Sequence, residues 1–147
     1  MDSLKDTVLA AFPLKELKRD PAQCAPLVLA YIGDTIYDLY VRTMLVSTGD
    51  LTTHKLHLAA AKHVCAAAQA KAFQRIEPTL CEEELALSRR GRNAHMGTIP
   101  KNATIRDYRA ATGFETLIGY LYLAGRDERL QALMNAAIFE EAAHAGS

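Results

Sequence analysis

The stretch LAYIGDTIYDLYVR, residues 29–42, has the apolar density of a buried helix, yet a carboxylate interrupts it. Asp34 stands in the middle of the stretch, and no lysine or arginine lies at a helical spacing on its N-terminal side. A buried carboxylate without a partner costs several kcal/mol, or its pKa rises until the group is neutral. Asp38 and Arg42, four residues apart, are explained by a helical ion pair near the surface. The charge of Asp34 needs another explanation.

A second lone carboxylate, Glu115, interrupts the apolar stretch ATGFETLIGYLYLAG, residues 111–125. Gly113 and Gly119 lie near it, and a glycine also precedes Asp34. Because glycine has no side chain, it allows a second helix to approach the backbone closely. We therefore predict a close helix crossing that brings two buried acids, Asp34 and Glu115, together.

Two carboxylates at one site repel each other unless they share a proton or bind a cation. Magnesium suits such a site, because it takes one or two carboxylates and fills its other positions with water and substrate phosphates. The alternative is that either acid caps a neighbouring helix or lies at the surface. The spacing alone leaves both interpretations open.

The composition is that of an ordinary globular domain, with 147 residues, of which 50% are hydrophobic and 23% charged. We expect one domain over residues 1–147. No apolar run reaches the roughly 18 residues of a membrane span, and the N-terminus lacks a signal-peptide pattern. The three cysteines, Cys24, Cys65 and Cys81, fit neither a disulfide framework nor a zinc motif. These features predict a cytoplasmic protein without a membrane partner.

Hydrophobic periodicity and capping residues predict helices throughout the chain and no strand. The expected helices cover about residues 3–12, 26–48, 53–75, 79–90, 104–124 and 127–144. Thr79 and Glu82 form a possible capping box for the fourth helix, which we expect to end before Gly91. The fold class predicted from the sequence is a single all-α domain.

The charged residues are unevenly distributed, although the formal net charge is zero. Residues 89–109 contain six lysines and arginines and one acid, a local charge of +5. Within them, residues 92–103 carry the loop signals Gly97 and Pro100. Such a segment forms a phosphate-binding surface or a solvated loop with helix-end charges, and the count alone does not decide between them.

Several motifs, in order along the chain, resemble the catalytic domain of ribonuclease III. YIGDTIYDLYVR, residues 31–42, is similar to the signature helix of that domain, and ATGFETLIGYLYL, residues 111–123, to its second acidic helix. The motifs LTTHKLH, AAAQA and RRGRNA lie between them in the expected order. The resemblance covers residues 21–133. Within the family, the chain most resembles the short bacterial form, Mini-ribonuclease III, which lacks a separate domain for binding double-stranded RNA.

The resemblance implies an all-helical endonuclease domain that forms a homodimer and uses magnesium to hydrolyse phosphodiesters in double-stranded RNA. For the short form it also implies maturation of the precursor of large-subunit (23S) ribosomal RNA. A symmetric dimer offers one acidic centre for each strand of a duplex. Whether a ribosomal protein must first shape the substrate stays open.

Residue by residue, Asp34 matches the catalytic aspartate of the signature helix, and Glu115 matches the catalytic glutamate of the second helix. Full-length family members place two further acids in the site, where this chain has Ala30 and Thr112. The resemblance therefore implies that Asp34 and Glu115 hold one magnesium ion, and it leaves a second ion open. His54, one turn from a second histidine at position 57, is interpreted as an ordinary helix residue rather than a metal ligand.

The basic segment supplies the expected RNA contacts. An A-form duplex presents phosphates and 2′-hydroxyl groups across a shallow minor groove. We predict phosphate contacts from Arg89, Arg90, Arg92 and Lys101, and a contact from Asn93 to the sugar edge. Two other interpretations stay open, namely a catalytically silent RNA-binding or ribosome-assembly dimer, and a purely structural helical dimer.

Overall fold

The computed structural model describes residues 2–13, 16–49, 51–94 and 97–139, and its regular elements in these ranges are all helical. The helices are α1 (Leu4–Leu9), α2 (Pro26–Ser47), α3 (Thr53–Val64), α4 (Ala66–Ile76), α5 (Glu82–Arg92), α6 (Ile105–Leu123) and α7 (Asp127–Met134). Short 3₁₀ turns, Pro21–Gln23 and Glu77–Thr79, precede α2 and α5, and a π-helical turn, Asn135–Phe139, follows α7. The predicted all-α fold is confirmed.

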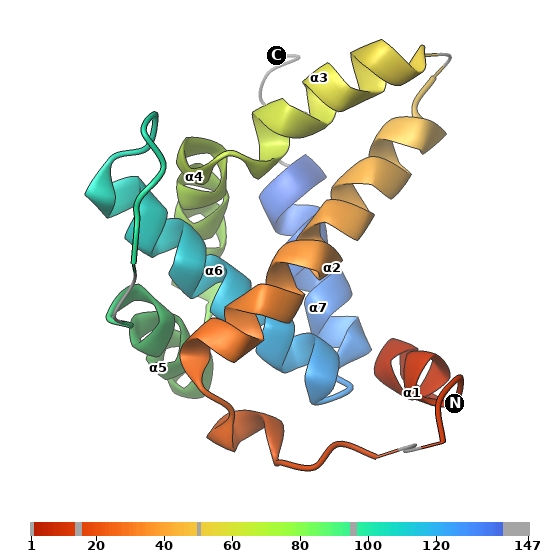
Figure 1. The fold of residues 1–147 in the computed structure, drawn as a ribbon, viewed down its shortest axis with the longest axis vertical. Coiled ribbons are helices and arrows are strands. Elements are labelled where there is room, and N and C mark those ends of the chain that lie inside the picture. The colour runs from red at the N-terminus through yellow and green to blue at the C-terminus, as the bar shows by residue number, and fades with distance from the viewer. Residues whose placement is uncertain (1, 14–15, 50, 95–96, 140–147) are drawn as a thin grey trace.

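Helix α6 is the centre of the fold, with α2 crossing it and α4, α5 and α7 packed around it (Figure 1). From residue 111 to residue 122 every side chain of α6 is buried except that of Glu115. Apolar residues of the neighbouring helices meet this core, and Tyr37 of α2 packs edge-on against Phe114 at 5.1 Å between ring centroids. Glu115 is therefore the single break in an otherwise buried stretch of α6.

The predicted close crossing of the two acidic helices is confirmed. A Cβ atom on Gly33 of α2 would collide with the backbone carbonyl of Glu115 on α6. A Cβ atom on Gly119 of α6 would collide with the backbone carbonyl of Leu29 on α2. Gly113 has a different partner, because it faces the backbone of Ser88 on α5. The glycines beside the acids thus set the distances between the helix backbones around the crossing.

Several helix boundaries follow directly from capping residues. Ser3 and Asp6 form a capping box at α1, and Pro26 occupies the first turn of α2, where its missing N–H is no loss. Thr104 accepts a hydrogen bond from the backbone N–H of Asp107 and so caps α6. The turn after α6 contains Gly125 at a φ of 71°, a left-handed conformation that favours glycine.

The single helix predicted over residues 53–75 is wrong. Cys65 has extended backbone angles, with φ −66° and ψ 156°, and it separates α3 from α4. Helix α3 packs against α2, whereas α4 packs against α6 (Figure 1). The alanine-rich sequence contains no glycine or proline that would signal the break. We attribute the break to this packing of its two halves against different helices.

The boundaries predicted for the fourth helix are also wrong. Thr79 ends the 3₁₀ turn, and the capping box of α5 is formed by Cys81 and Glu84 instead, with the N–H of Cys81 donating to Glu84 at 3.0 Å. Gly91 does not end α5, which continues to Arg92. Gly91 lies against Thr116, where a Cβ atom would meet the threonine side chain.

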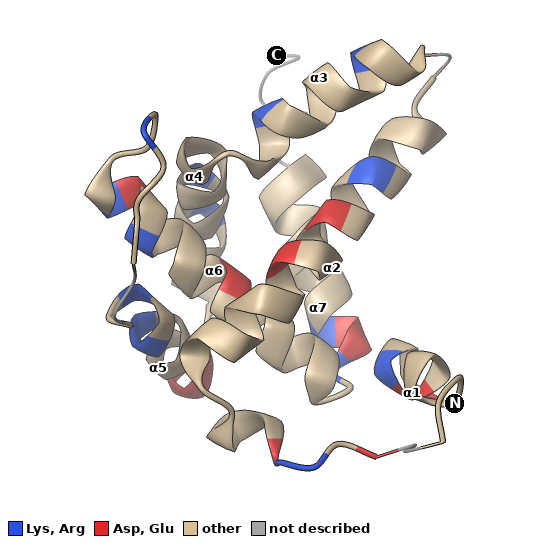
Figure 2. Cartoon of the chain, in the orientation of Figure 1, with Lys and Arg blue, Asp and Glu red and all other residues tan. Residues whose placement is uncertain are grey.

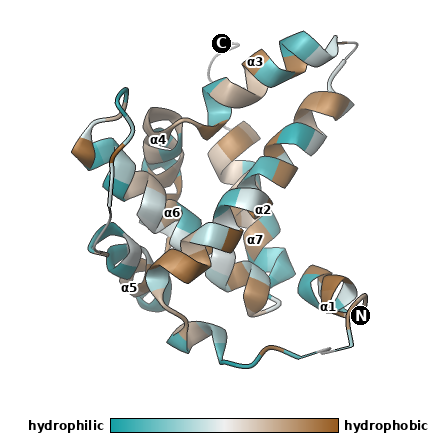
Figure 3. Ribbon diagram, in the orientation of Figure 1, coloured by the Kyte–Doolittle hydropathy of each residue, from teal (hydrophilic) through white to brown (hydrophobic). Residues whose placement is uncertain are grey.

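At the C-terminal end, α7 is shorter than predicted, and the π-helical turn replaces its continuation. Residues 140–144, which were expected to be helical, lie outside the described part of the chain, as do residues 95 and 96 of the predicted loop. None of the helices described has the length and apolar content that a membrane span requires. Figure 3 shows polar and apolar residues interspersed along their surfaces.

Candidate active site

The crossing of α2 and α6 brings Asp34 and Glu115 into one cleft of about 540 Å³. The other walls of this acidic cleft are the end of α3, the start of α4, the segment of residues 100–104 and the first two turns of α6. In Figure 2 the acidic positions of α2 and α6 lie close together where the helices cross. The predicted meeting of Asp34 and Glu115 is therefore confirmed.

The two carboxylates differ in their exposure to solvent. Asp34 is exposed, so the expectation that both acids are buried is wrong for this residue. Its position on α2 places the side chain beside the crossing rather than within the core. Glu115 is partly buried, and burial raises its pKa to about 9, with the negative charge of Asp34 and a hydrogen bond to Asp34 as further causes. The pair holds a proton that a cation can replace.

The donor set of the acidic cleft fits magnesium. Nowhere in the described ranges do three or more His, Cys, Asp and Glu side chains form a group able to hold a metal ion. A closed zinc site needs such a group, because zinc takes four ligands of this kind. Magnesium needs one or two carboxylates, with water and phosphate oxygens completing its octahedron. Asp34 and Glu115 supply these two carboxylates.

The positions at which full-length family members carry further acids add no charge to the cleft. Ala30 is buried in α2. Thr112 is buried in α6, and its hydroxyl group donates a hydrogen bond to the carbonyl of Tyr108 at 2.9 Å. Asp34 and Glu115 are therefore the carboxylates that the crossing of α2 and α6 brings together, and Asp107 lines the cleft in the first turn of α6 without forming a group of three possible metal ligands with them.

The two histidines considered as metal ligands, His54 and His57 of α3, do not line the acidic cleft. His54 and His57 are exposed, and His57 lines a separate groove of about 150 Å³ between α2 and α3. Arg42 and Leu45 line the same groove. This placement agrees with their interpretation as ordinary helix residues.

A second cleft, of about 610 Å³, collects much of the basic segment. This basic cleft is lined by Arg92 and Asn93 at the end of α5, by Arg106 and Arg109 at the start of α6, and by parts of α4. Figure 2 shows basic positions at both of these helix ends. The acidic and basic clefts adjoin across the first turn of α6, because Asp107 lines both.

Arg106 and Arg109 belong to the basic segment, although the sequence did not single them out as RNA contacts. Their spacing of three residues on one helix was the signal for a shared face. Arg92 has local partners, since its guanidinium lies 5.5 Å from the ring centroid of Phe73 and 4.0 Å from a carboxylate oxygen of Glu77. These interactions hold Arg92 at the wall of the basic cleft.

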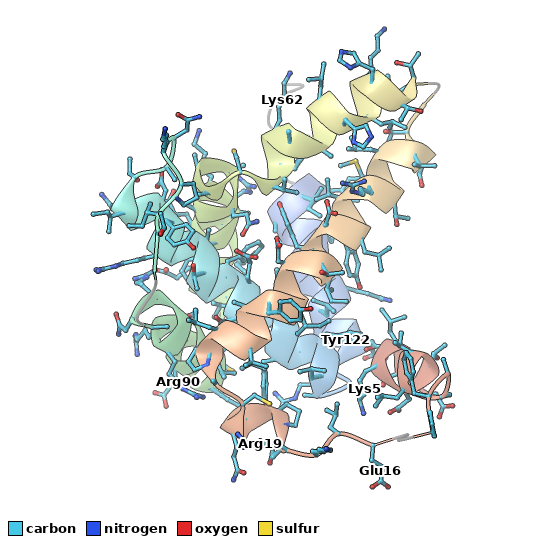
Figure 4. The ribbon with its side chains drawn as sticks, viewed as in Figure 1. Lys5, Glu16, Arg19, Lys62, Arg90 and Tyr122 are labelled. Atoms are coloured by element: carbon cyan, nitrogen blue, oxygen red, sulfur yellow. The ribbon has the colours of Figure 1, made fainter. Side chains whose placement is uncertain are left out.

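The remaining predicted RNA contacts lie in different places. Arg90 donates hydrogen bonds to the backbone carbonyls of Ala22 and Cys24, each at 3.2 Å, and so ties α5 to the turn before α2 (Figure 4). Arg89 is exposed on α5, and Lys101 is exposed beside the acidic cleft. Arg90 thus has a structural role of its own, and its phosphate contact stays a prediction.

Comparison with known proteins agrees with this geometry. The family model of the ribonuclease III domain matches residues 27–126. Mini-ribonuclease 3 of Brevibacillus brevis is 50% identical over 123 residues, which are 84% of this chain and 92% of the relative. Mini-ribonuclease 3 of Clostridium tetani is 48% identical over 122 residues, which are 82% of this chain and 81% of the relative.

A solved structure shows the same fold. The crystal structure of a protein from Fusobacterium nucleatum superposes with a TM-score of 0.76 at 28% sequence identity, covering 84% of this chain and 99% of the other. The family match spans both acidic helices and the basic segment between them. The chain therefore belongs to the ribonuclease III family and is a ribonuclease of that family.

Proposed function

We propose that this ribonuclease cleaves double-stranded RNA with the help of magnesium held by Asp34 and Glu115. The observation that carries the proposal is the acidic cleft, in which two carboxylates from crossing helices face each other and one has a pKa of about 9. Such a pair is unfavourable in its doubly charged form. A divalent cation compensates both charges and makes the arrangement favourable.

Asp34 and Glu115 would hold the cation at the crossing of α2 and α6. When bound there, magnesium would supply an activated water for attack on the phosphorus and would neutralise charge that develops on the phosphate oxygens. The adjoining start of α4 has no side-chain cap, so its first N–H groups place positive partial charge at the wall of the cleft. This charge favours an RNA phosphate next to the two acids.

We propose that the basic cleft and its surroundings bind the phosphates of the duplex. The predicted contacts are Arg89, Arg90, Arg92, Asn93 and Lys101, and the geometry adds Arg106 and Arg109. The basic cleft adjoins the acidic cleft, so a backbone held by these arginines passes close to the carboxylates. Phosphate contacts of this kind recognise a duplex by its backbone rather than by its sequence.

We further propose that residues 1–147 form one domain and that two copies form a homodimer through α2. This helix exposes an apolar stripe formed by Val28, Tyr31, Leu39 and Val46, which lie on one face at helical spacing. Tyr31, in the second turn of α2, is 80% exposed, which is unusual for an aromatic residue. An exposed apolar stripe of this kind is typical of an interface.

In the cell, we propose that the substrate is the precursor of 23S ribosomal RNA in the cytoplasm, as the resemblance to the short form implies. The three cysteines are unpaired, which agrees with a reducing compartment. In cells that lack this protein we expect the 23S precursor to retain its unprocessed ends, measured by primer extension. Normal ends in such cells would contradict this assignment.

The central test compares cleavage of a long RNA duplex by the parent protein and by Asp34→Asn, with and without magnesium. We expect cleavage to require magnesium and to be lost in Asp34→Asn, whereas folding and RNA binding survive. Asp38→Asn is the matched control, because Asp38 lies one turn further along α2 and pairs with Arg42 at 2.9 Å. Unchanged cleavage by Asp34→Asn would contradict the proposed site. Binding without cleavage by the parent would instead favour the catalytically silent module.

A further inference from the structure

Gln69 is the most deeply buried polar residue at the acidic cleft. It lies on α4, lines the cleft together with Asp34 and Glu115, and is only 2% exposed. Buried polar side chains in folded proteins have hydrogen-bond partners in the large majority of cases. The hydrogen-bond partners of Gln69 therefore indicate whether the described part of the chain satisfies both polar atoms of its amide group.

The amide nitrogen of Gln69 has a partner, and this partner fixes the orientation of the amide. Nε2 donates a hydrogen bond to the backbone carbonyl of Val64 at 3.1 Å. The reversed orientation would place Oε1 against that carbonyl oxygen, and two acceptors repel. Oε1 is thus held in place by the end of α3.

The amide oxygen has no hydrogen-bond partner within the described part of the chain. A buried acceptor without a donor costs about 1–3 kcal/mol. The acids of the same cleft do not satisfy Oε1, because Asp34 and Asp107 accept hydrogen bonds when ionised and the hydrogen bond of Glu115 is made with Asp34. A hydrogen-bond donor that enters the cleft together with the bound cation removes the cost of leaving Oε1 unpaired.

Waters held by a divalent cation are donors of the required kind. Magnesium retains several waters when only one or two carboxylates hold it. Groups that accept hydrogen bonds around a metal orient its ligands and raise its affinity. Since Ala30 and Thr112 contribute no carboxylate, a neutral oxygen from Gln69 adds an acceptor to the cleft without adding like charge.

We propose that Oε1 of Gln69 accepts a hydrogen bond from a water in the hydration shell of the cation held by Asp34 and Glu115. This inference rests on the proposed function, because it requires the cation. Gln69 is then a positioning residue, which acts through that water rather than by contact with the RNA. The break at Cys65 makes this possible, because it lets α4 start at the wall of the cleft.

The test is a titration of the RNA-free protein with Mn²⁺, with the free ion followed by electron paramagnetic resonance. We expect Gln69→Leu to bind Mn²⁺ about 10-fold more weakly than the parent, as is typical for loss of a group that orients metal ligands. Gln131→Leu is the matched control, because it is the same change at an exposed helix position, on α7, outside the acidic and basic clefts. Its affinity should equal that of the parent.

Gln69→Glu separates metal positioning from a purely structural role. Both Gln69→Leu and Gln69→Glu lose the hydrogen bond to Val64, but the glutamate keeps a side-chain oxygen. We expect Gln69→Glu to keep the parent affinity for Mn²⁺ or exceed it, and Gln69→Leu to melt within a few degrees of the parent. Equal affinities of Gln69→Leu and the parent would overturn the proposal, as would equal losses of affinity in Gln69→Leu and Gln69→Glu.

Asp34→Asn in the same titration distinguishes the two possible failures. In one outcome the parent binds Mn²⁺, Asp34→Asn does not, and Gln69→Leu has the same affinity for Mn²⁺ as the parent. The metal site is then supported, and the role proposed for Gln69 is wrong. If Gln69→Leu keeps its affinity for Mn²⁺ but loses affinity for duplex RNA, Gln69 contacts the RNA instead, and the proposal is also wrong. If the parent does not bind Mn²⁺, the proposed metal site itself fails.

Discussion

Burial and the charge of Asp34 both raise the pKa of Glu115, which reaches about 9. The folded-state pKa lies above the ordinary value of 4.5, so the folded protein holds a proton that the unfolded chain releases between these two values. The free energy of unfolding therefore falls as the pH rises through this window. Glu115 therefore makes the metal-free protein less stable at higher pH, where its ionised carboxylate binds a cation most readily.

We predict that Glu115→Gln removes this pH dependence. With a chelator present, the variant should be more stable than the parent at about pH 8, by at least about 1.4 kcal/mol, the free energy of one pKa unit. At about pH 4, below the ordinary value of the group, the two proteins should be nearly equal. Urea unfolding at both pH values measures the difference. An equal difference at both values would show that Glu115 does not titrate in this window.

At the scale of the elements, the crossing of α2 and α6 depends on glycine. A Cβ atom on Gly33 has no room, because the backbone carbonyl of Glu115 lies against the same point. We predict that Gly33→Ala lowers the free energy of unfolding by about 1–3 kcal/mol, as overpacking does in a tight core, and weakens cleavage by moving the acids apart. Gly49→Ala is the control, since nothing lies within 4 Å of its added Cβ atom. Urea unfolding that shows no loss in Gly33→Ala would contradict the crossing.

The same elements show how far the sequence predicts the site. Each acid interrupts an apolar helix close to a glycine, and this local pattern suggested that Asp34 and Glu115 meet, but it left a capping or surface role open. The resemblance of the two helices to those of the ribonuclease III domain decided between these interpretations. The break at Cys65 was not predictable, because it depends on α3 packing against α2 while α4 packs against α6. The burial of Gln69 on α4 was not predictable either, because it depends on how α4 packs in the fold. The exposure of Asp34 likewise depends on where α2 lies relative to its neighbours.

At the scale of the whole molecule, the basic cleft predicts a strong dependence of RNA binding on salt. Removing the side chain that neutralises one phosphate should reduce the slope of log K against log salt by about 0.7–0.9. We predict that Arg106→Ala and Arg109→Ala each weaken duplex binding and flatten this slope, measured by gel shift at several salt concentrations. Arg19→Ala, an exposed arginine in the segment before α2 (Figure 4), should leave the slope unchanged. Equal slopes for all of these proteins would contradict the placement of RNA in the basic cleft.

The exposed stripe on α2 predicts an assembly of two copies. Tyr31→Glu places a charge on this stripe and should shift the protein from dimer to monomer, because an interface excludes an unpaired charge. Sedimentation velocity measures the change. Leu58→Glu is the control, at an exposed apolar residue of α3 outside the stripe. A parent protein that sediments as a monomer would refute the dimer, and so would a dimer of Tyr31→Glu as stable as that of the parent.

The stoichiometry of Mn²⁺ binding tests most directly whether Asp34 and Glu115 share one ion. Isothermal titration calorimetry of the RNA-free parent should give one ion per chain, and either Asp34→Asn or Glu115→Gln alone should remove that binding step. Asp38→Asn should leave it intact. One remaining ion of parent affinity in either Asp34→Asn or Glu115→Gln would mean that the two carboxylates do not act together, and it would contradict the account.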